Sequence, residues 1–294
     1  MIRLALITWI GATDLGADGE LLLPALDRLG VAGIPVGWAA ELEAGSFDGA
    51  VIRSASDYID DPRRFLDWCR QTSSRMPLAN PVDVLVWNSD KRYLQDLQRA
   101  GVAIVPTLWI GPGESLETVP WERFVVKPVI SAGARSSASY DRSGRLAARR
   151  HVDAITAAGV TAMVQPHLSA IDREGEVGTY VIGGKVSHAI RKAGVLRVGE
   201  PPAADLSRGR HQQVVPTPVL DEHARFARAV LDSVPGGPDR LLYARVDMAR
   251  GEDGELLLIE LECIEPRLFL EHAPDRAGAV AGAFAAWLRR PSAG

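Results

Sequence analysis

Three glutamates interrupt the apolar stretch LLLIELECIEP, which spans residues 256–266. Apart from Glu260, Glu262 and Glu265, the stretch has the composition of a buried strand. An unpaired carboxylate in such a place costs so much free energy that a compensating positive charge is expected. The chemistry that these residues indicate is therefore the binding of a cation.

The surrounding segment ARVDMARGEDGELLLIELECI, residues 244–264, has the pattern of a β-hairpin that turns at its Asp-Gly dipeptide. If these two residues alone form the turn, Asp247 faces Glu260 and Arg245 faces Glu262. Because side chains alternate along a strand, all four then lie on one face of the sheet. A longer turn would shift the pairing by one step and keep the shared face.

Asp247, Glu260 and Glu262 are the metal ligands that this hairpin predicts. Side chains that oppose each other across a hairpin have Cβ atoms about 4.5–5.5 Å apart, so three ionised carboxylates there repel one another. A hard divalent cation removes the repulsion, and carboxylate oxygens suit Mg²⁺. The alternative is a solvated sheet face on which Arg245 is the counter-ion.

A phosphate site is the expected complement, because Mg²⁺ held by few carboxylates completes its shell with phosphate oxygens. Lys127 ends the strand FVVKP, and the loop SAGARSS follows at residues 131–137. Ser131, Ala132 and Gly133 are small enough for backbone N–H groups to approach a phosphate, to which Lys127 would add a point charge. No Walker A motif is present, and a lysine before a polar loop also occurs without any nucleotide.

The elements that position these residues begin with residues 1–88, where strands alternate with helical patterns. This alternation predicts a small parallel sheet covered by helices. Ligands of such sheets bind at the carboxyl ends of the strands, and VIRSASDY is such an end. Arg53, Ser54 and Asp57 are therefore the predicted substrate-binding residues.

Two further units are predicted, at residues 89–164 and 165–294. A helix capped by Asn88 or Ser89 opens the first, which continues with a strand, the small-residue loop and another strand. A strand broken by Pro166 predicts a hinge, and a hairpin turning at Gly183-Gly184 follows. The fold class that we expect is α/β, and in part α+β.

Composition excludes several classes of protein. Lysine and arginine number 33 against 37 acidic residues, which gives a net charge of −4 and no indication of nucleic acid as a partner. No apolar run reaches the length of a membrane span, and the N-terminus has the pattern of a first strand rather than a signal peptide. The two cysteines have no metal or redox spacing, so we expect both reduced, in a cytoplasmic protein.

The order of these features resembles the ATP-grasp superfamily of carboxylate–amine ligases. The most specific parts are FVVKPVISAGARSS, MVQPHL and ARVDMARGEDGELLLIELECIEP, and the resemblance covers most of the chain. It implies a parallel α/β subdomain, a small central subdomain and a C-terminal subdomain with an antiparallel sheet. It also implies ATP and Mg²⁺ as cofactors, with two ions sharing the metal site.

The resemblance also implies which residues bind the nucleotide. The phosphates are contacted by two lysines, Lys91 and Lys127, beneath a flexible loop at residues 131–137. The adenine is bound at the hinge by Gln165, Pro166, His167 and Leu168. The ribose hydroxyls are bound by Glu176, with Glu174 as the second choice.

The resemblance places the metal at Asp247, Glu260 and Glu262. Many members of the superfamily have asparagine where Glu262 stands, so this site carries an additional negative charge. The segments RSASDY, LANPVDVLVWNSDKRYLQDL and IELECIEPRLFL resemble a narrower branch. That branch includes the O-ureido-D-serine cyclo-ligase of D-cycloserine biosynthesis, an antibiotic pathway.

The activity implied is ATP-dependent phosphorylation of a carboxylate, followed by attack of a nitrogen on the acyl phosphate. Arg191 is a candidate for contacting the transferring phosphate, and Arg245 for stabilising the tetrahedral oxyanion. Arg267 is a candidate for binding a substrate carboxylate bidentately, or it balances Glu265. Each arginine could equally be an ordinary ion-pair partner.

Three functions stay open at this point. The first is cyclisation of a small amino-acid-like substrate, in which the carboxylate and the nitrogen belong to one molecule. The second is a ligase that forms a peptide or adds an amino acid to a protein. The third is a non-catalytic ATP-binding regulator, which the full set of lysines and carboxylates disfavours. Substrate, chirality and homo-oligomerisation are not indicated by the sequence.

Overall fold

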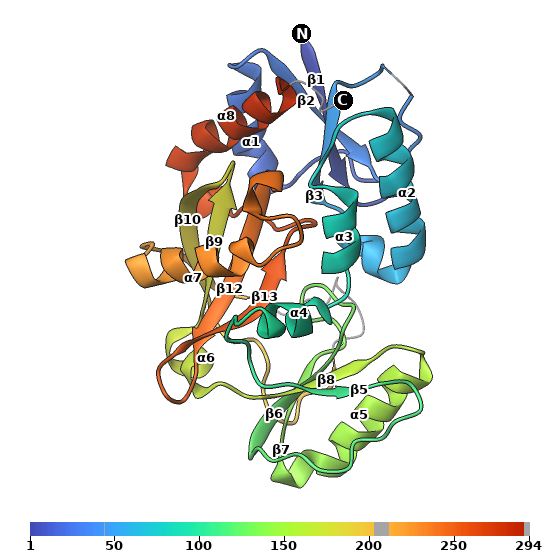
Figure 1. Cartoon of the computed structure of the whole chain (residues 1–294), viewed down its shortest axis with the longest axis vertical. Coiled ribbons are helices and arrows are strands. Elements are labelled where there is room, and N and C mark those ends of the chain that lie inside the picture. Colours follow the sequence, from blue (N-terminus) through green and yellow to red (C-terminus); the bar gives the residue numbers. More distant parts are fainter. Residues whose placement is uncertain (44, 203–211, 291–294) are drawn as a thin grey trace.

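The computed structural model describes residues 1–43, 45–202 and 212–290, and its strands form three sheets (Figure 1). The predicted range 165–294 therefore includes segments, 203–211 and 291–294, that lie outside the described residues. Both the mixed α/β class and the parallel N-terminal sheet are confirmed.

The bounds of the strands are as follows. The parallel sheet has the order β2-β1-β3-β4 and consists of β1 (Ile2–Thr8), β2 (Val31–Gly37), β3 (Gly49–Ser54) and β4 (Leu78–Ala79). The central antiparallel sheet has the order β5-β8-β6-β7 and consists of β5 (Leu108–Ile110), β6 (Arg123–Pro128), β7 (Ala138–Asp141) and β8 (Ala162–Pro166). The C-terminal antiparallel sheet has the order β11-β10-β9-β12-β13 and consists of β9 (Glu176–Ile182), β10 (Lys185–Lys192), β11 (Val214–Thr217), β12 (Tyr243–Arg250) and β13 (Leu256–Glu262).

The helices cover these sheets, and α5 lies along the central one (Figure 1). Their bounds are α1 (Ala17–Asp27), α2 (Pro62–Arg75), α3 (Val82–Asn88), α4 (Tyr93–Arg99), α5 (Arg145–Ala157), α6 (Ser169–Glu174), α7 (Asp221–Asp232) and α8 (Ala277–Leu288). Short 3₁₀ helices occur at η1 (Ser56–Asp60), η2 (Arg142–Gly144), η4 (Pro238–Arg240), η5 (Leu270–His272) and η6 (Pro274–Arg276). Within the described part of the chain, no helix has the length and apolar character that crossing a membrane requires.

The packing crosses the predicted unit boundaries in two places. Apolar residues of α3 and α4 belong to the core of the C-terminal sheet, together with residues of β12 and β13. The last helix, α8, packs with α1 in a core shared with the N-terminal sheet. The ranges 1–88, 89–164 and 165–294 stay a prediction.

The hairpin that carries the carboxylates has the predicted register. Asp247 pairs with Glu260, and Arg245 pairs with Glu262. The connecting loop, 251–255, is longer than the expected two-residue turn, but the register shifts by one residue directly after Asp247. This β-bulge offsets the longer loop, so the pairing at the carboxylates is unchanged.

β13 is an edge strand, and side chains from other elements bind its outer backbone groups. Asn88 donates to Leu261 O and accepts from Cys263 N, both at 2.8 Å. The hydroxyl of Tyr93 accepts from Leu261 N at 2.7 Å. Asn88 thus ends α3 and binds β13 instead of capping the helix that we predicted to start there. These buried contacts fix the strand that carries Glu260.

The second hairpin, β9–β10, turns at Gly183-Gly184 as predicted. Both glycines have positive φ, 56° and 77°, which a two-residue hairpin turn of the I′ type requires. Cys69 and Cys263 are both free and buried, as expected.

Candidate functional site

A cavity of about 740 Å³, called the cleft below, is lined by residues from all three sheets. β3 contributes Arg53, β6 contributes Lys127, and β13 contributes Glu260 and Glu262. The ends of the sheets therefore meet where the sequence predicted the phosphate and metal sites.

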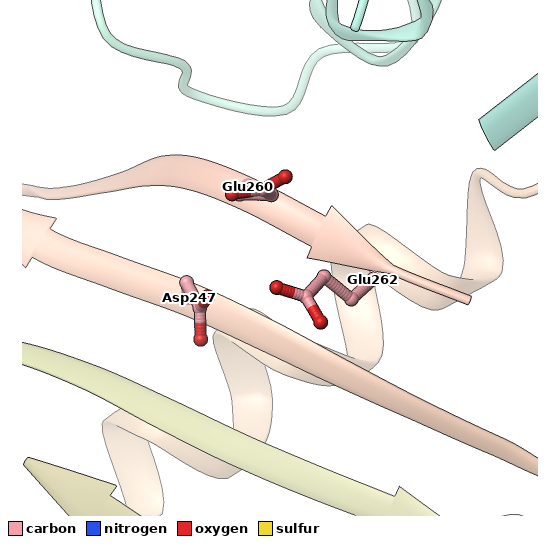
Figure 2. A group of neighbouring side chains, drawn as sticks. All are labelled: Asp247, Glu260 and Glu262. Atoms are coloured by element: carbon pink, nitrogen blue, oxygen red, sulfur yellow. The ribbon is translucent and has the colours of Figure 1, made fainter. Parts of the chain in front are cut away.

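The three predicted metal ligands are neighbours on the β12–β13 hairpin (Figure 2). One carboxylate oxygen from each of Asp247, Glu260 and Glu262 lies within 4.8 Å of the others. Glu260 and Glu262 line the cleft, whereas Asp247 is only 1% exposed. Three hard oxygen donors at this spacing fit a divalent cation such as Mg²⁺.

Two buried cations already compensate Asp247. Arg245 binds it bidentately, with Nε 2.8 Å from Oδ1 and Nη2 2.9 Å from Oδ2, and also pairs with Glu262. Lys192 Nζ lies 2.9 Å from Asp247 Oδ2 and forms a second ion pair with Glu176. The carboxylates are therefore embedded in a network in which each negative charge faces a positive one.

The network separates the pKa values of the three carboxylates. Burial raises the pKa of Asp247, but Arg245 and Lys192 outweigh this effect and lower it to about 2. Burial also raises the pKa of Glu262, and Glu260 adds to the effect, so that it reaches about 7 despite Arg245. Burial raises the pKa of Glu260, but the charges of Lys91 and Lys127 outweigh burial and lower it.

The two predicted phosphate lysines lie side by side in the cleft. Lys91 Nζ donates to Ser131 O at 2.6 Å and lies 3.1 Å from Glu260 Oε1. Burial, with the neighbouring charge of Lys91, lowers the pKa of Lys127 to about 8, although Glu260 opposes the shift. The neighbouring carboxylates do not fully stabilise the charged form of Lys127, so an anion that enters the cleft would stabilise it further.

The loop 131–137 lies over this pair of lysines. Ser131, Ala132 and Gly133 line the cleft, and Gly133 and Ala134 have φ values of 58° and 59°. These residues lie in a turn, and successive backbone N–H groups in turn conformations can form a concave site for anions. At its tip Arg135 forms an ion pair with Asp60 of η1, with a distance of 2.6 Å between Nη1 and Oδ1.

The predicted hinge also lines the cleft, through Gln165, Pro166, His167 and Leu168. Gln165 Nε2 donates to Thr107 Oγ1 at 2.8 Å, and this contact fixes the orientation of the amide. His167 Nε2 lies 2.8 Å from Asp172 Oδ2 at the start of α6. Glu176, the predicted ribose ligand, lines the same region.

Two predicted site residues lie outside the cleft. Asp57 does not line it; its carboxylate accepts from Ile10 N at 3.0 Å and from Trp38 Nε1 at 2.8 Å, because η1 turns it toward β2. Arg191 donates to Glu174 O at 2.6 Å and is also not a lining residue. Its neighbour Lys192 lies in the cleft instead, because successive residues of a strand face opposite sides.

The other predicted substrate residues do line the cleft. Ser54 Oγ donates to Thr8 Oγ1 at 3.0 Å, and Arg53 donates to Pro266 O at 2.6 Å. Arg267 is more exposed and forms an ion pair with Glu271. Its guanidinium carbon lies 4.4 Å from the centre of the Phe269 ring.

Among the cleft residues that sequence reasoning did not assign to the site are Lys192 and Glu265. Lys192 was overlooked in favour of the adjacent arginine. Glu265 was recognised as a carboxylate in the apolar run but was given no role beyond balancing Arg267; burial and the charge of Glu262 raise its pKa well above its ordinary value. A carboxylate that interrupts an apolar run was the available signal.

Comparisons of the sequence and of the structure with known proteins find the same relative. Residues 4–80 match the family model for the N-terminal domain of D-cycloserine synthetase DcsG. Over 301 residues the chain is 31% identical to the cycloserine biosynthesis protein DcsG of Streptomyces lavendulae, an alignment that covers 97% of this chain and 99% of the relative.

Solved structures extend the comparison to the fold. The crystal structure of D-cycloserine synthetase DcsG superposes with a TM-score of 0.84 and 28% identity, covering 98% of this chain and all of that chain. A D-alanine–D-alanine ligase from Bacillus anthracis superposes with a TM-score of 0.68 and 14% identity, covering 98% and 96% of the two chains. The ATP-grasp ligase PsnB, solved with Mg and ADP, reaches 0.62 at 15% identity, covering 97% and 98%.

Proposed function

Because this chain belongs to the DcsG family of ATP-grasp ligases, we propose that it closes a small amino-acid-like substrate into a ring at the expense of ATP. That it is an ATP-dependent ligase forming carbon–nitrogen bonds follows from the family. The substrate that we propose is O-ureido-D-serine, with D-cycloserine as the product. The observation that carries this proposal is the 31% identity along 97% of the chain.

ATP and Mg²⁺ are the proposed cofactors, as in the related ligase that was solved with Mg and ADP. Mg²⁺ would be held by Asp247, Glu260 and Glu262, and would screen the phosphate charges during transfer. That two ions share these carboxylates is part of the proposal. Lys91 and Lys127 would bind the phosphates beneath the loop 131–137.

The remaining nucleotide contacts are proposed on their positions in the cleft. The adenine would lie against the hinge, Gln165 to Leu168, with Glu176 at the ribose. Since Glu176 is paired with Lys192, this lysine would lie between the sugar and the phosphates. It replaces Arg191 in our proposal as the third cation of the phosphate region.

The reaction needs no nucleophilic side chain. A carboxylate oxygen of the substrate attacks the γ-phosphorus of ATP, the bond to ADP breaks, and an acyl phosphate forms. The nitrogen next to the ether oxygen then attacks the carbonyl carbon, and phosphate leaves from the tetrahedral intermediate. Arg245, which lines the cleft beside Glu262, would stabilise the oxyanion. Loss of the carbamoyl group to water then completes D-cycloserine.

Release of ADP and the identity of the product test this proposal together. Purified protein with ATP and Mg²⁺ is incubated with O-ureido-D-serine, its L-enantiomer, D-alanine or no amino acid, and products are identified by mass spectrometry. We expect ADP release with O-ureido-D-serine and equimolar D-cycloserine. A dipeptide from D-alanine, or no ADP release with any substrate, would contradict cyclisation.

A further inference from the structure

Glu265 is a carboxylate of the cleft wall that no other group in the described part of the chain compensates directly. It follows the last proposed metal ligand by three residues, lines the cleft, and is half-buried. Across the described residues, no hydrogen bond and no ion pair is formed by its side chain. It is also not among the three carboxylates whose oxygens cluster within 4.8 Å. Its carboxyl oxygens are therefore available to a ligand.

The cations nearest to Glu265 are engaged elsewhere. Arg53 donates to Pro266 O at 2.6 Å, and its guanidinium carbon lies 5.1 Å from the ring centre of Tyr243. Arg245 is bound to the metal-site carboxylates, and Arg267 forms its ion pair with Glu271. None of these groups lies within hydrogen-bonding distance of the Glu265 carboxyl, so a cationic group of a ligand would meet no competing partner there.

The backbone after Glu265, residues 266–270, is held rigidly although it has little regular structure. Buried Asp18 accepts from Leu268 N at 2.7 Å and from Leu270 N at 2.9 Å. Two other side chains bind carbonyls of this segment: the Tyr180 hydroxyl donates to Arg267 O at 2.6 Å, and His188 Nε2 lies 2.8 Å from Leu268 O. Such support from buried side chains is what a preorganised binding group requires.

Tyr58 supplies a second polar group at the same place. It lines the cleft, and its hydroxyl forms no hydrogen bond with the residues that the structure describes. Among the surrounding charges, that of Glu265 acts on Tyr58 most strongly. A carboxylate and a hydroxyl that line one cleft are the acceptors that bind a primary ammonium group.

We propose that Glu265, assisted by the Tyr58 hydroxyl, binds the α-ammonium group of the substrate. The inference rests on the proposed function, in which the reacting carboxylate of the substrate lies beside Arg245 and the metal held by Glu260 and Glu262. In an α-amino acid the ammonium and carboxylate are attached to one carbon, so their subsites must adjoin. Three residues of chain span at most about 10 Å, which keeps Glu265 within reach of Glu262. The substrate class is therefore amino acids with a free α-amino group.

Glu265→Gln tests the proposal, because it keeps the volume and removes the charge. Two probes are used, O-ureido-D-serine and 3-(ureidooxy)propanoate, which is the same molecule without its amino group. For O-ureido-D-serine we expect the Kd from calorimetry and the KM to rise about 10–100-fold, the usual range for losing a hydrogen bond to a charged group. The KM for ATP should stay within about twofold, and the des-amino probe should bind both proteins equally poorly.

Glu255→Gln is the matched control, since it makes the same chemical change on an exposed glutamate that does not line the cleft. It should keep the parent affinities. Tyr58→Phe should weaken binding of O-ureido-D-serine less than Glu265→Gln and should leave the des-amino probe unaffected. Thermal melting of each variant identifies any loss of folding.

Parent-like affinity of Glu265→Gln for O-ureido-D-serine would overturn the inference and leave the proposed cyclisation intact. An equal loss of affinity for the des-amino probe would also overturn it, because the ammonium would then not be the group recognised. Binding that depends on Glu265, without formation of a ring, would support the ammonium site and refute the cyclisation. Absence of binding to the parent would refute both.

Discussion

Lys192→Met should destabilise the ligand-free protein, because Lys192 is the buried cation between two carboxylates. Its amino group lies 2.9 Å from Asp247 Oδ2 and pairs with Glu176. Burial lowers the pKa of Lys192, yet Asp247 and Glu176 outweigh burial and raise it above its ordinary value. Methionine has a similar length and removes only the charge and the hydrogen bonds.

The expected loss follows from the partners that remain. Breaking a buried ion pair by removing one member costs about 3–5 kcal/mol, since an uncompensated charge is left behind. Asp247 keeps its bidentate contact with Arg245, which places the loss at the lower end, about 3 kcal/mol. For a chain of this size each kcal/mol lowers the melting temperature by about 2–4 °C, so a decrease of about 6–12 °C is expected.

Thermal melting followed by circular dichroism, without ATP or Mg²⁺, measures this effect. Lys185→Met is the matched control, because Lys185 is an exposed lysine at the other end of β10. Its melting temperature should stay within about 2 °C of the parent. The double variant Lys192→Met/Asp247→Asn should melt higher than the sum of the single losses predicts, since the uncompensated charge is then absent. Equal melting of the Lys192 and Lys185 variants would refute the buried-pair reasoning.

Three further outcomes are expected. ATP binding should weaken as the pH rises through about 8, because the pKa of Lys127 is about 8 and only the protonated amine attracts phosphate; Lys127→Arg stays charged and should remove this dependence in calorimetric titrations. Glu260→Gln should remain folded by circular dichroism and release ADP at least about 100-fold more slowly, so parent-like release would exclude Glu260 as a metal ligand. Gly178→Ala should lower both the melting temperature and ADP release, because its Cβ would lie 2.8 Å from Asp247 Oδ1; unchanged values would show that the carboxylate can shift without cost.

The two hairpins show how far local pattern predicts a site. At β12–β13 the loop is longer than the two-residue turn that we assumed, and a bulge directly after Asp247 offsets the difference. The predicted pairs are therefore correct; the longer loop is the alternative that the sequence left open, and only the bulge was not foreseen. Bulges depend on how the whole sheet bends and packs, and no dipeptide of this hairpin predicts one.

At β9–β10 the turn has the predicted length, so the bulge there changes the pairing of the residues that follow it. The two-residue glycine turn was predicted correctly, and simple alternation from it would pair Arg191 with Glu176. The register shifts by one residue between Val186 and Ala189, so Lys192 pairs with Glu176 instead. The shift by one residue contributes to placing Lys192, and not Arg191, opposite Glu176 in the cleft.

Contacts between distant segments could not be predicted from the sequence, for a different reason. The rule for parallel sheets brought Arg53 to the cleft, but its hydrogen bond reaches Pro266, 213 residues further along the chain. The same rule failed for Asp57, because η1 turns that carboxylate back onto the indole of Trp38. Residue types and strand ends predict which segments lie near the site, and only the folded structure shows which of their side chains line it.

The ion pair between Arg135 and Asp60 would couple the binding of the two proposed ligands of the cleft, ATP and the substrate. It joins the loop over the phosphate lysines to the N-terminal unit that carries Arg53, Ser54 and Tyr58. Any ligand that holds the loop in this position therefore also favours the substrate side, and reciprocity requires the same factor in both directions. An exposed pair contributes at most about 1 kcal/mol, so through this contact each ligand can tighten the other by no more than about fivefold.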